Sequence, residues 1–156
     1  MRKYMAAQIL ALAIKDPRIV ILTADLGYGV WDEARDTLGD RFINVGCREQ
    51  AMAGIAAGLA MAGMRPVIYS ICNFLVHRAF EQIRIDIVHH NLPVLMIGVG
   101  RDGSYKNCGI THDGKLDAQL VKLLRVELCQ PKSLTGVDWF LGKWTVADKP
   151  LYLRLR

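Results

Sequence analysis

Three uninterrupted apolar runs constrain the fold of this chain more than any other feature. They cover residues 19–23, 66–71 and 93–99, and each is rich in aliphatic side chains. A strand with one solvated face alternates apolar and polar residues, whereas a strand of a parallel sheet is buried on both faces and reads as a continuous apolar run. The three runs therefore predict central strands of a mainly parallel sheet.

The segments between these runs have helical patterns, so strands and helices alternate. Helices are predicted at 3–15, 31–38, 49–62, 74–89, 115–124 and 137–143, and shorter strands at 42–45, 126–129 and 151–155. The helix at 74–89 is amphipathic, with Phe80, Ile83 and Ile87 on one side and Arg78, Glu81 and Arg84 elsewhere. Parallel strands joined by crossover helices form an open sheet with helices on both faces. We therefore predict an α/β fold, open and doubly wound, in which ligands bind beyond the carboxyl ends of the strands.

Length and composition fit one globular domain, because 156 residues with a hydrophobic fraction of 52% can form a sizeable core. The net charge of +5 comes from scattered basic residues, which favours a solvated surface over nucleic-acid binding. The apolar stretch at 6–14 ends without a small-residue cleavage site, and 51–64 is too short to span a bilayer. We expect a cytoplasmic protein with no membrane or nucleic-acid partner.

The cysteines favour free thiols over a zinc site or a disulfide framework. Cys47, Cys72, Cys108 and Cys129 lack the CxxC spacing of a metal site. They also fall in different predicted elements, which gives no small disulfide-rich framework.

Several polar or aromatic residues follow the predicted strands, and each has an ordinary structural explanation when taken alone. Asp25 suits a turn, because Asp readily bonds its own downstream backbone. Glu49 suits the first turn of a helix, where a negative charge favours the helix dipole. Phe74 suits a core aromatic, and His77 and His112 suit solvated positions.

The helix predicted after Glu49 consists of small apolar residues. Residues 51–62 are all Ala, Gly, Met, Ile or Leu, so this helix has no charged face for solvent. It suits the core of the monomer or a subunit interface, and the two roles are compatible. Desolvation favours the protonated form of a carboxyl group, whereas a helix N-terminus favours the charged form. The residues leave both effects open at Glu49.

Taken together, four motifs resemble the pyrimidine-binding domain of the transketolase family in their order and spacing. They are residues 23–27 (TADLG), 46–50 (GCREQ), 73–74 (NF) and 109–113 (GITHD). The resemblance covers nearly the whole chain. It extends to deoxyxylulose-phosphate synthase and, around 72–74, to the beta subunit of pyruvate-dehydrogenase-type enzymes.

The resemblance implies a thiamine-diphosphate enzyme in which Glu49 and His112 are catalytic. In the family, a glutamate at the position of Glu49 hydrogen-bonds N1′ of the aminopyrimidine ring and activates the cofactor. An aromatic residue at the position of Phe74 stacks on that ring. Asp25 matches an aspartate near the thiazolium side of the cleft, and His112 matches a histidine that faces substrate oxygens.

The match is less close at four other positions of the predicted pocket. His77 and Ile71 fall where transketolases carry a Tyr and a Phe that contact the cofactor, so both are expected cofactor contacts. Ile110 and Asp113 replace the Pro and Gln of the family's Gly-Pro-Thr-His-Gln loop. Because of these two departures, the resemblance does not fix the shape of this loop or the choice of substrate.

The sequence lacks the Gly-Asp-Gly…Asn motif with which family members bind the diphosphate and Mg²⁺ on a separate domain. The resemblance thus implies that residues 1–156 form a pyrimidine-binding domain, without the diphosphate-binding domain and the C-terminal transketolase domain. We expect a heterotetramer with a diphosphate-binding subunit that supplies Mg²⁺, acting on a small carbonyl or sugar substrate by ketol transfer or carboligation. The alternatives are a non-catalytic scaffold or regulator, and a subunit of a two-chain 2-oxo acid decarboxylase or dehydrogenase.

Overall fold

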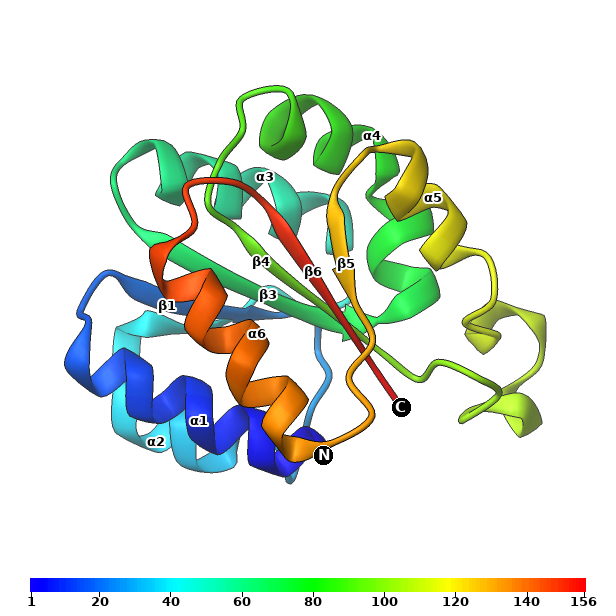
Figure 1. Cartoon of the computed structure of the whole chain (residues 1–156), viewed down its shortest axis with the longest axis horizontal. Coiled ribbons are helices and arrows are strands. Elements are labelled where there is room, and N and C mark those ends of the chain that lie inside the picture. Colours follow the sequence, from blue (N-terminus) through cyan, green and yellow to red (C-terminus); the bar gives the residue numbers. More distant parts are fainter.

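Six strands form one sheet in the order β2-β1-β3-β4-β6-β5, and every neighbouring pair is parallel (Figure 1). The computed structural model describes residues 1–156, with the side chain of Lys106 excepted. The strands are β1 (Ile19–Thr23), β2 (Phe42–Asn44), β3 (Arg65–Ile71), β4 (Leu95–Val99), β5 (Glu127–Cys129) and β6 (Leu151–Leu155). The predicted parallel sheet is confirmed.

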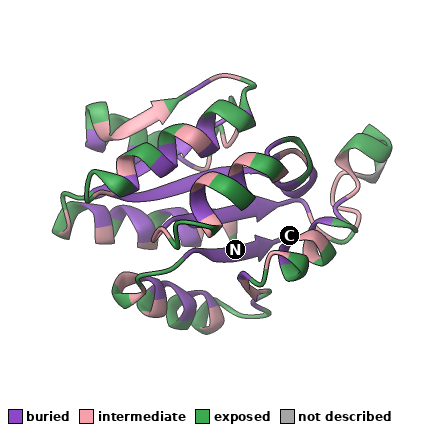
Figure 2. Ribbon diagram, turned by 90° about the horizontal axis from the view of Figure 1, so that it is seen from above, coloured by how far each residue is buried: buried purple, intermediate pink, exposed green. Residues whose placement is uncertain are grey.

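Helices cover both faces of this sheet (Figures 1 and 2). One face carries α1 (Arg2–Lys15), α2 (Asp32–Leu38) and α6 (Leu134–Val146). The other carries α3 (Glu49–Met61), α4 (Phe80–Gln82), α5 (Asp117–Leu123) and two π-helical segments, η2 (Phe74–Arg78) and η3 (Ile83–Val88). Short 3₁₀ turns are η1 (Gly39–Arg41), η4 (Lys106–Cys108) and η5 (Ile110–His112). The structure is therefore the open, doubly wound α/β fold that the sequence predicts.

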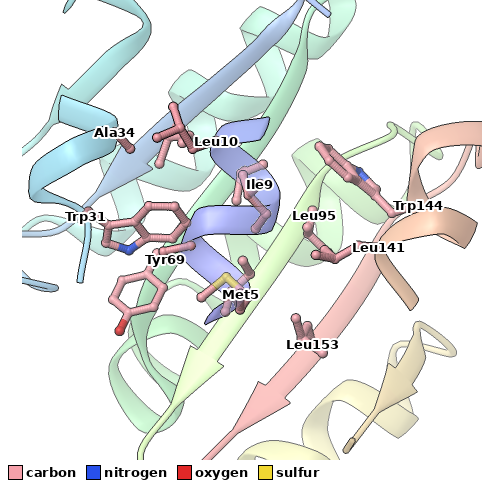
Figure 3. Packing of buried hydrophobic residues seen from close by; sticks show 14 of the residues in the cluster. Met5, Ile9, Leu10, Trp31, Ala34, Tyr69, Leu95, Leu141, Trp144 and Leu153 are labelled. Carbon is pink, nitrogen blue, oxygen red and sulfur yellow. The ribbon is translucent and has the colours of Figure 1, made fainter. Parts of the chain in front are cut away.

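Each face of the sheet has its own hydrophobic core. Figure 3 shows part of the first, where Met5 of α1 lies near Tyr69, and Trp144 of α6 lies beside the sheet. The second core contains Met52, Ile68, Leu75, Ile83 and Met96. Successive residues of a strand point to opposite faces, so β3 supplies side chains to both cores. This two-sided burial explains why the central strands read as unbroken apolar runs.

The segment predicted as one amphipathic helix at 74–89 is helical but not regular. Its first and last parts, η2 and η3, have the wide turns of π-helix, and only the short α4 between them is α-helical. The apolar pattern correctly marks Ile83 and Ile87 as buried. It does not specify backbone pairing, and π turns are rare insertions that often occur at functional sites.

The helices of the chain are short. The longest, α1, has 14 residues, and α3 and α6 have 13 residues each. A transmembrane helix needs about 20 apolar residues. Within the described residues, no helix has the length and apolar character needed to cross a membrane.

Gly98 of β4 allows Tyr152 of β6 to pack across the sheet. A Cβ atom at Gly98 would collide with Oη of Tyr152 and lie 3.2 Å from Sγ of Cys72, and both neighbours are fully buried. We expect Gly98→Ala to lower the free energy of unfolding by about 1–3 kcal/mol, because the phenol must shift within a filled core. Urea unfolding measures this change.

The matched control for this prediction is Gly142→Ala in α6. Nothing lies within 4 Å of a Cβ added there, and alanine favours a helix interior over glycine. This variant should therefore keep or slightly raise the free energy of unfolding. Equal midpoints for Gly98→Ala and the wild type would contradict the close approach of Tyr152.

Candidate functional site

The candidate site lies where the chain changes direction across the sheet. β2 pairs with one side of β1, and β3 pairs with the other side. The carboxyl ends of β1 and β3 therefore border the kind of crevice in which open α/β proteins bind ligands. Asp25 follows β1, Glu49 begins α3 after β2, and Phe74 follows β3. Three of the predicted residues thus reach the same edge of the sheet.

Glu49 is a buried carboxylate whose two oxygens both have partners. It is only 2% exposed, although it is the first residue of α3. The Ser70 hydroxyl of β3 donates a hydrogen bond to Oε1 at 3.1 Å, and Nη1 of Arg78 donates one to Oε2 at 3.1 Å. Burying a charge is costly unless it is paired and hydrogen-bonded. A solvated first-turn Glu would need neither partner.

Arg78 connects Glu49 to Phe74. Its guanidinium carbon lies 3.7 Å from the centroid of the Phe74 ring, while Nη1 pairs with Glu49. The Arg78 side chain is nevertheless 47% exposed. Sequence reasoning missed this residue and treated it as a polar position of an amphipathic helix. The available signal was its spacing from Phe74, because residues four apart on a helical turn are neighbours.

Two hollows meet at Arg78. The first has a volume of about 580 Å³ and is lined by Cys47, Arg48, Glu49, Gln50, Ala51 and Arg78. The second, of about 570 Å³, is lined by Asn73, Phe74, His77, Arg78, Ile110, Thr111, Asp113, Lys115 and Leu116. Glu49 opens into one hollow and Phe74 into the other, so the Arg78 side chain forms the wall between them.

His112 packs against Phe74 from the loop that follows β4. The two ring centroids are 4.7 Å apart with an interplanar angle of 70°, an edge-to-face arrangement favoured by aromatic pairs. Nδ2 of Asn73 donates to the carbonyl oxygens of Ile110 and Thr111 at 3.4 and 3.3 Å, which ties this loop to the start of η2. Glu49, Phe74 and His112 are therefore connected in series, because Arg78 contacts both Glu49 and Phe74, and Phe74 contacts His112.

Asp25 lies at the same edge, but its carboxylate is engaged locally. The Tyr28 hydroxyl donates a hydrogen bond to Oδ1, and Nδ2 of Asn44 donates to the same oxygen at 3.2 Å. The hydrogen bond from Tyr28 contributes most, and that from Asn44 less, to lowering the pKa of Asp25 below its ordinary value. Sγ of Cys47 is 4.0 Å from Oδ2, so Asp25 touches the segment that leads into Glu49.

The structure separates His77 and Ile71, the two expected cofactor contacts at less closely matched positions. His77 is exposed and lines the same hollow as Phe74. Ile71 is buried in the first core and lines a small cavity of about 120 Å³ with Tyr69 and Tyr105. Ser70 of the same strand contacts Glu49 on the opposite face. Ile71 therefore does not share a hollow with Glu49 or Phe74.

A buried ion pair anchors the loop that carries His112, and sequence reasoning missed it. Arg154 of β6 donates from Nε to Oδ2 of Asp117 at 2.7 Å and from Nη2 to Oδ1 at 2.9 Å. Arg154 also donates to the Gly114 carbonyl, and the Tyr152 hydroxyl donates to Asp117 at 3.0 Å. The loop is thereby fixed to the central sheet.

The cysteines do not form disulfides in this structure. All four are free, with Cys72 buried and Cys47 and Cys108 exposed. Burial raises the pKa of Cys72 to about 12, which keeps it a thiol at neutral pH. Among the described side chains, no group of three or more His, Cys, Asp or Glu residues is arranged to hold a metal ion.

Related sequences carry the same domain. The family described as "Transketolase, pyrimidine binding domain" matches residues 1–133. A 1-deoxy-D-xylulose-5-phosphate synthase from Clostridium tetani (strain Massachusetts / E88) is 30% identical over 97% of this chain and 25% of the synthase. An uncharacterized 33.6 kDa protein in the fasciation locus of Rhodococcoides fascians is 38% identical over 62% of this chain and 31% of that protein.

Solved structures have the same fold. A split-gene transketolase, described as an inactive beta4 tetramer, superposes with a TM-score of 0.85 and 27% identity, over 98% of this chain and 49% of that chain. A transketolase from Leishmania mexicana gives a TM-score of 0.84 at 19% identity, over 98% of this chain and 24% of that chain. The chain thus spans about a quarter to a third of these curated relatives. Since the family match covers residues 1–133 of 156, the chain belongs to the transketolase pyrimidine-binding domain family.

Proposed function

We propose that this chain is the pyrimidine-binding subunit of a two-chain transketolase-like enzyme that performs ketol transfer or carboligation. Transketolases and 1-deoxy-D-xylulose-5-phosphate synthases use thiamine diphosphate. The observation that carries the proposal is the buried Glu49 carboxylate at the start of α3, linked through one arginine to the ring of Phe74. A helix-capping role alone does not account for this burial.

Arg78 serves as a stand-in for judging whether Glu49 and Phe74 fit the aminopyrimidine half of the cofactor. A guanidinium group is planar and carries hydrogen-bonding groups at its edge. In this structure it lies on the face of Phe74 and bonds Glu49 at the same time. A planar aminopyrimidine that stacks on Phe74 and bonds a carboxyl group at its edge needs the same two contacts. The residues present therefore fit this half of the cofactor.

The chain's own side chains would divide the work as follows. When bound, thiamine diphosphate supplies the electron sink that allows a bond beside a carbonyl group to break and form. Glu49 would share a proton with the ring nitrogen that it faces, and Phe74 would fix the orientation of the ring. His112 would contact oxygen atoms of the substrate. Asp25, His77 and Ile71 remain predicted cofactor contacts, with Ile71 the least favourably placed.

A partner chain would hold the diphosphate half of the cofactor together with Mg²⁺. This sequence has no Gly-Asp-Gly…Asn motif, and the split-gene transketolase is a relative whose name describes a divided enzyme. The outer face of α3 offers a docking surface next to Glu49, because Ala51, Ile55, Gly58 and Met61 are exposed there. We propose a heterotetramer built on this face.

The isolated chain should bind thiamine diphosphate weakly and without a requirement for Mg²⁺. The diphosphate carries most of the charge of the cofactor, and the proposed site for it lies on the partner chain. Calorimetry on the isolated chain and on its mixture with the diphosphate-binding subunit of a split transketolase measures the difference. Thiamine, which lacks the diphosphate, serves as the matched control ligand. Tight, Mg²⁺-dependent binding by the chain alone would rule out the divided cofactor site.

Two other functions remain as alternatives. A scaffold or regulator would not need a buried Glu49 beside Phe74 and His112, so these residues favour catalysis. A two-chain 2-oxo acid decarboxylase or dehydrogenase would use the same Glu49, and it differs in the substrate. Assay of the reconstituted complex with ketose donors and with 2-oxo acids distinguishes these activities.

A further inference from the structure

Arg78 occupies both contacts that the proposed function assigns to the aminopyrimidine ring. Its guanidinium covers the face of Phe74 at 3.7 Å and bonds Glu49 at 3.1 Å. The ring of the cofactor cannot stack on Phe74 and bond Glu49 while the guanidinium is there. Arg78 also separates the hollow that holds Glu49 from the hollow that holds Phe74. Access to both residues from one space requires this side chain to move.

We propose that Arg78 is an autoinhibitory placeholder, which the aminopyrimidine ring displaces when it binds. This inference rests on the proposed function. In the free subunit, Arg78 neutralises the Glu49 carboxylate and covers the apolar face of Phe74. Binding is then an exchange in which one planar, hydrogen-bonding group replaces another.

The side chain of Arg78 is suited to such an exchange. It is 47% exposed, whereas its partner Glu49 is 2% exposed. Within the described residues, the Arg78 guanidinium forms no hydrogen bond or ion pair other than that with Glu49. A long side chain with one ionic partner and an open route to solvent can change rotamer without rearranging the backbone, provided that another group takes its place at Glu49.

Burial of Glu49 makes the two events depend on each other. A carboxylate that loses its only cationic partner inside the protein is strongly disfavoured. Ser70 supplies one neutral hydrogen bond, which does not replace the charge. The Arg78 side chain is therefore held in place until another group bonds Glu49. The closed form lowers the apparent affinity for any pyrimidine ligand by the fraction of molecules that are open.

The first test measures binding of thiamine to the isolated chain by calorimetry. Thiamine carries the aminopyrimidine ring without the diphosphate, so the partner chain is not needed to hold it. We expect Arg78→Gln to bind thiamine at least ~10-fold more tightly than the wild type. This factor corresponds to a wild-type chain in which less than about a tenth of the molecules have Arg78 displaced from Glu49. Equal or weaker binding by Arg78→Gln would overturn the placeholder. Equal binding would mean that Arg78 has no effect on the ligand, and weaker binding would mean that Arg78 contacts it.

Two further variants control this measurement. Arg84→Gln removes an exposed arginine from η3 without touching Glu49 or Phe74, and its affinity should equal that of the wild type. Arg78→Lys keeps a positive charge for Glu49 but loses the planar group that covers Phe74. Its affinity should lie between those of the wild type and Arg78→Gln. It also preserves the ion pair if Arg78→Gln fails to fold.

The second test follows Arg78 itself by nuclear magnetic resonance in the wild-type chain. The guanidinium carbon of Arg78 lies over the Phe74 ring, so the neighbouring ε- and δ-protons should have ring-current-shifted resonances, which Phe74→Leu abolishes. Saturation with thiamine should move these resonances to the positions of a solvated arginine. Binding that leaves them unmoved would overturn the placeholder and leave the proposed function intact. If thiamine binds neither the wild type nor Arg78→Gln, and thiamine diphosphate does not bind in the presence of the partner chain, the proposed function fails and the placeholder fails with it.

Discussion

Replacing Glu49 by alanine in the reconstituted two-chain enzyme is expected to lower turnover by at least ~10²-fold, while the two chains still assemble. Glu49 is a buried carboxylate that borders the hollow at the start of α3. Alanine cannot exchange a proton with a ring nitrogen, so activation of the cofactor should be lost. Steady-state kinetics measures the turnover, and size-exclusion chromatography measures the assembly.

Glu33→Ala is the matched control for this substitution. Glu33 also lies in the first turn of a helix, α2, but it is exposed. A carboxylate that only stabilises a helix dipole contributes about 0.3–1 kcal/mol and no activity. Glu33→Ala should therefore keep wild-type rates. If Glu49→Ala also keeps wild-type rates, Glu49 only stabilises the first turn of its helix and takes no part in activity.

Glu49→Gln separates proton exchange from hydrogen bonding. Glutamine retains the shape of the side chain and can still bond Ser70 and a ring nitrogen, but it does not titrate. It should therefore lose nearly as much turnover as Glu49→Ala. The variant should nevertheless retain its affinity for thiamine while it loses turnover, since the charge that holds Arg78 in place is gone.

The central strands could be predicted because their residues fit only one environment. β1, β3 and β4 are buried along their whole lengths. A continuous aliphatic run has no solvent-facing position, so it does not suit an edge or a half-exposed strand. The same reasoning places Asp25, Glu49 and Phe74 near the carboxyl edge of the sheet, because each follows a predicted strand.

The contacts of Arg78 could not be predicted in the same way. Its partner Glu49 lies 29 residues earlier in the chain, and the two meet only after α3 and η2 pack on the same face. An amphipathic pattern indicates which apolar side chains point inward, but not which polar side chains meet. The π turns of η2 further alter the directions in which its side chains point.

The start of α6 shows a signal that was present in the sequence and not used. The helix begins at Leu134, earlier than the predicted residue 137. Ser133 is its N-cap, because the Ser133 hydroxyl accepts a hydrogen bond from the Gly136 amide at 3.1 Å. Serine is a preferred N-cap residue, so capping together with hydrophobic period would have placed this boundary correctly.

Replacing Asp117 by asparagine is expected to lower the free energy of unfolding by about 3–5 kcal/mol at neutral pH. Asp117 is fully buried and receives hydrogen bonds from two nitrogens of Arg154, which is itself buried. Burial raises the pKa of Asp117, but the hydrogen bonds and charge of Arg154 outweigh it and hold that pKa below its ordinary value. Asparagine would leave the Arg154 cation buried without a counter-charge.

The pH dependence of this loss follows from the direction of the shift. The pKa of Asp117 is lower in the folded chain than in the unfolded chain, where it is about 4. Its contribution to stability is therefore present above about pH 4 and is lost as the pH falls through the folded pKa. Urea unfolding from neutral pH to about pH 3 should show the difference between Asp117→Asn and the wild type shrinking. Asp36→Asn, at an exposed ion pair, should change stability by less than about 1 kcal/mol throughout.

A double substitution separates the charge pair from the anchoring of the loop. Asp117→Leu combined with Arg154→Met removes both charges and leaves no unpaired ion, so it should be more stable than Asp117→Asn. It also removes the hydrogen bond from Arg154 to the Gly114 carbonyl, which fixes the loop that carries His112. Stability should then recover relative to Asp117→Asn, while turnover of the reconstituted enzyme should be lower than that of the wild type. A double variant less stable than Asp117→Asn would show that the hydrogen bonds to the loop, rather than the pairing of charges, stabilise this region.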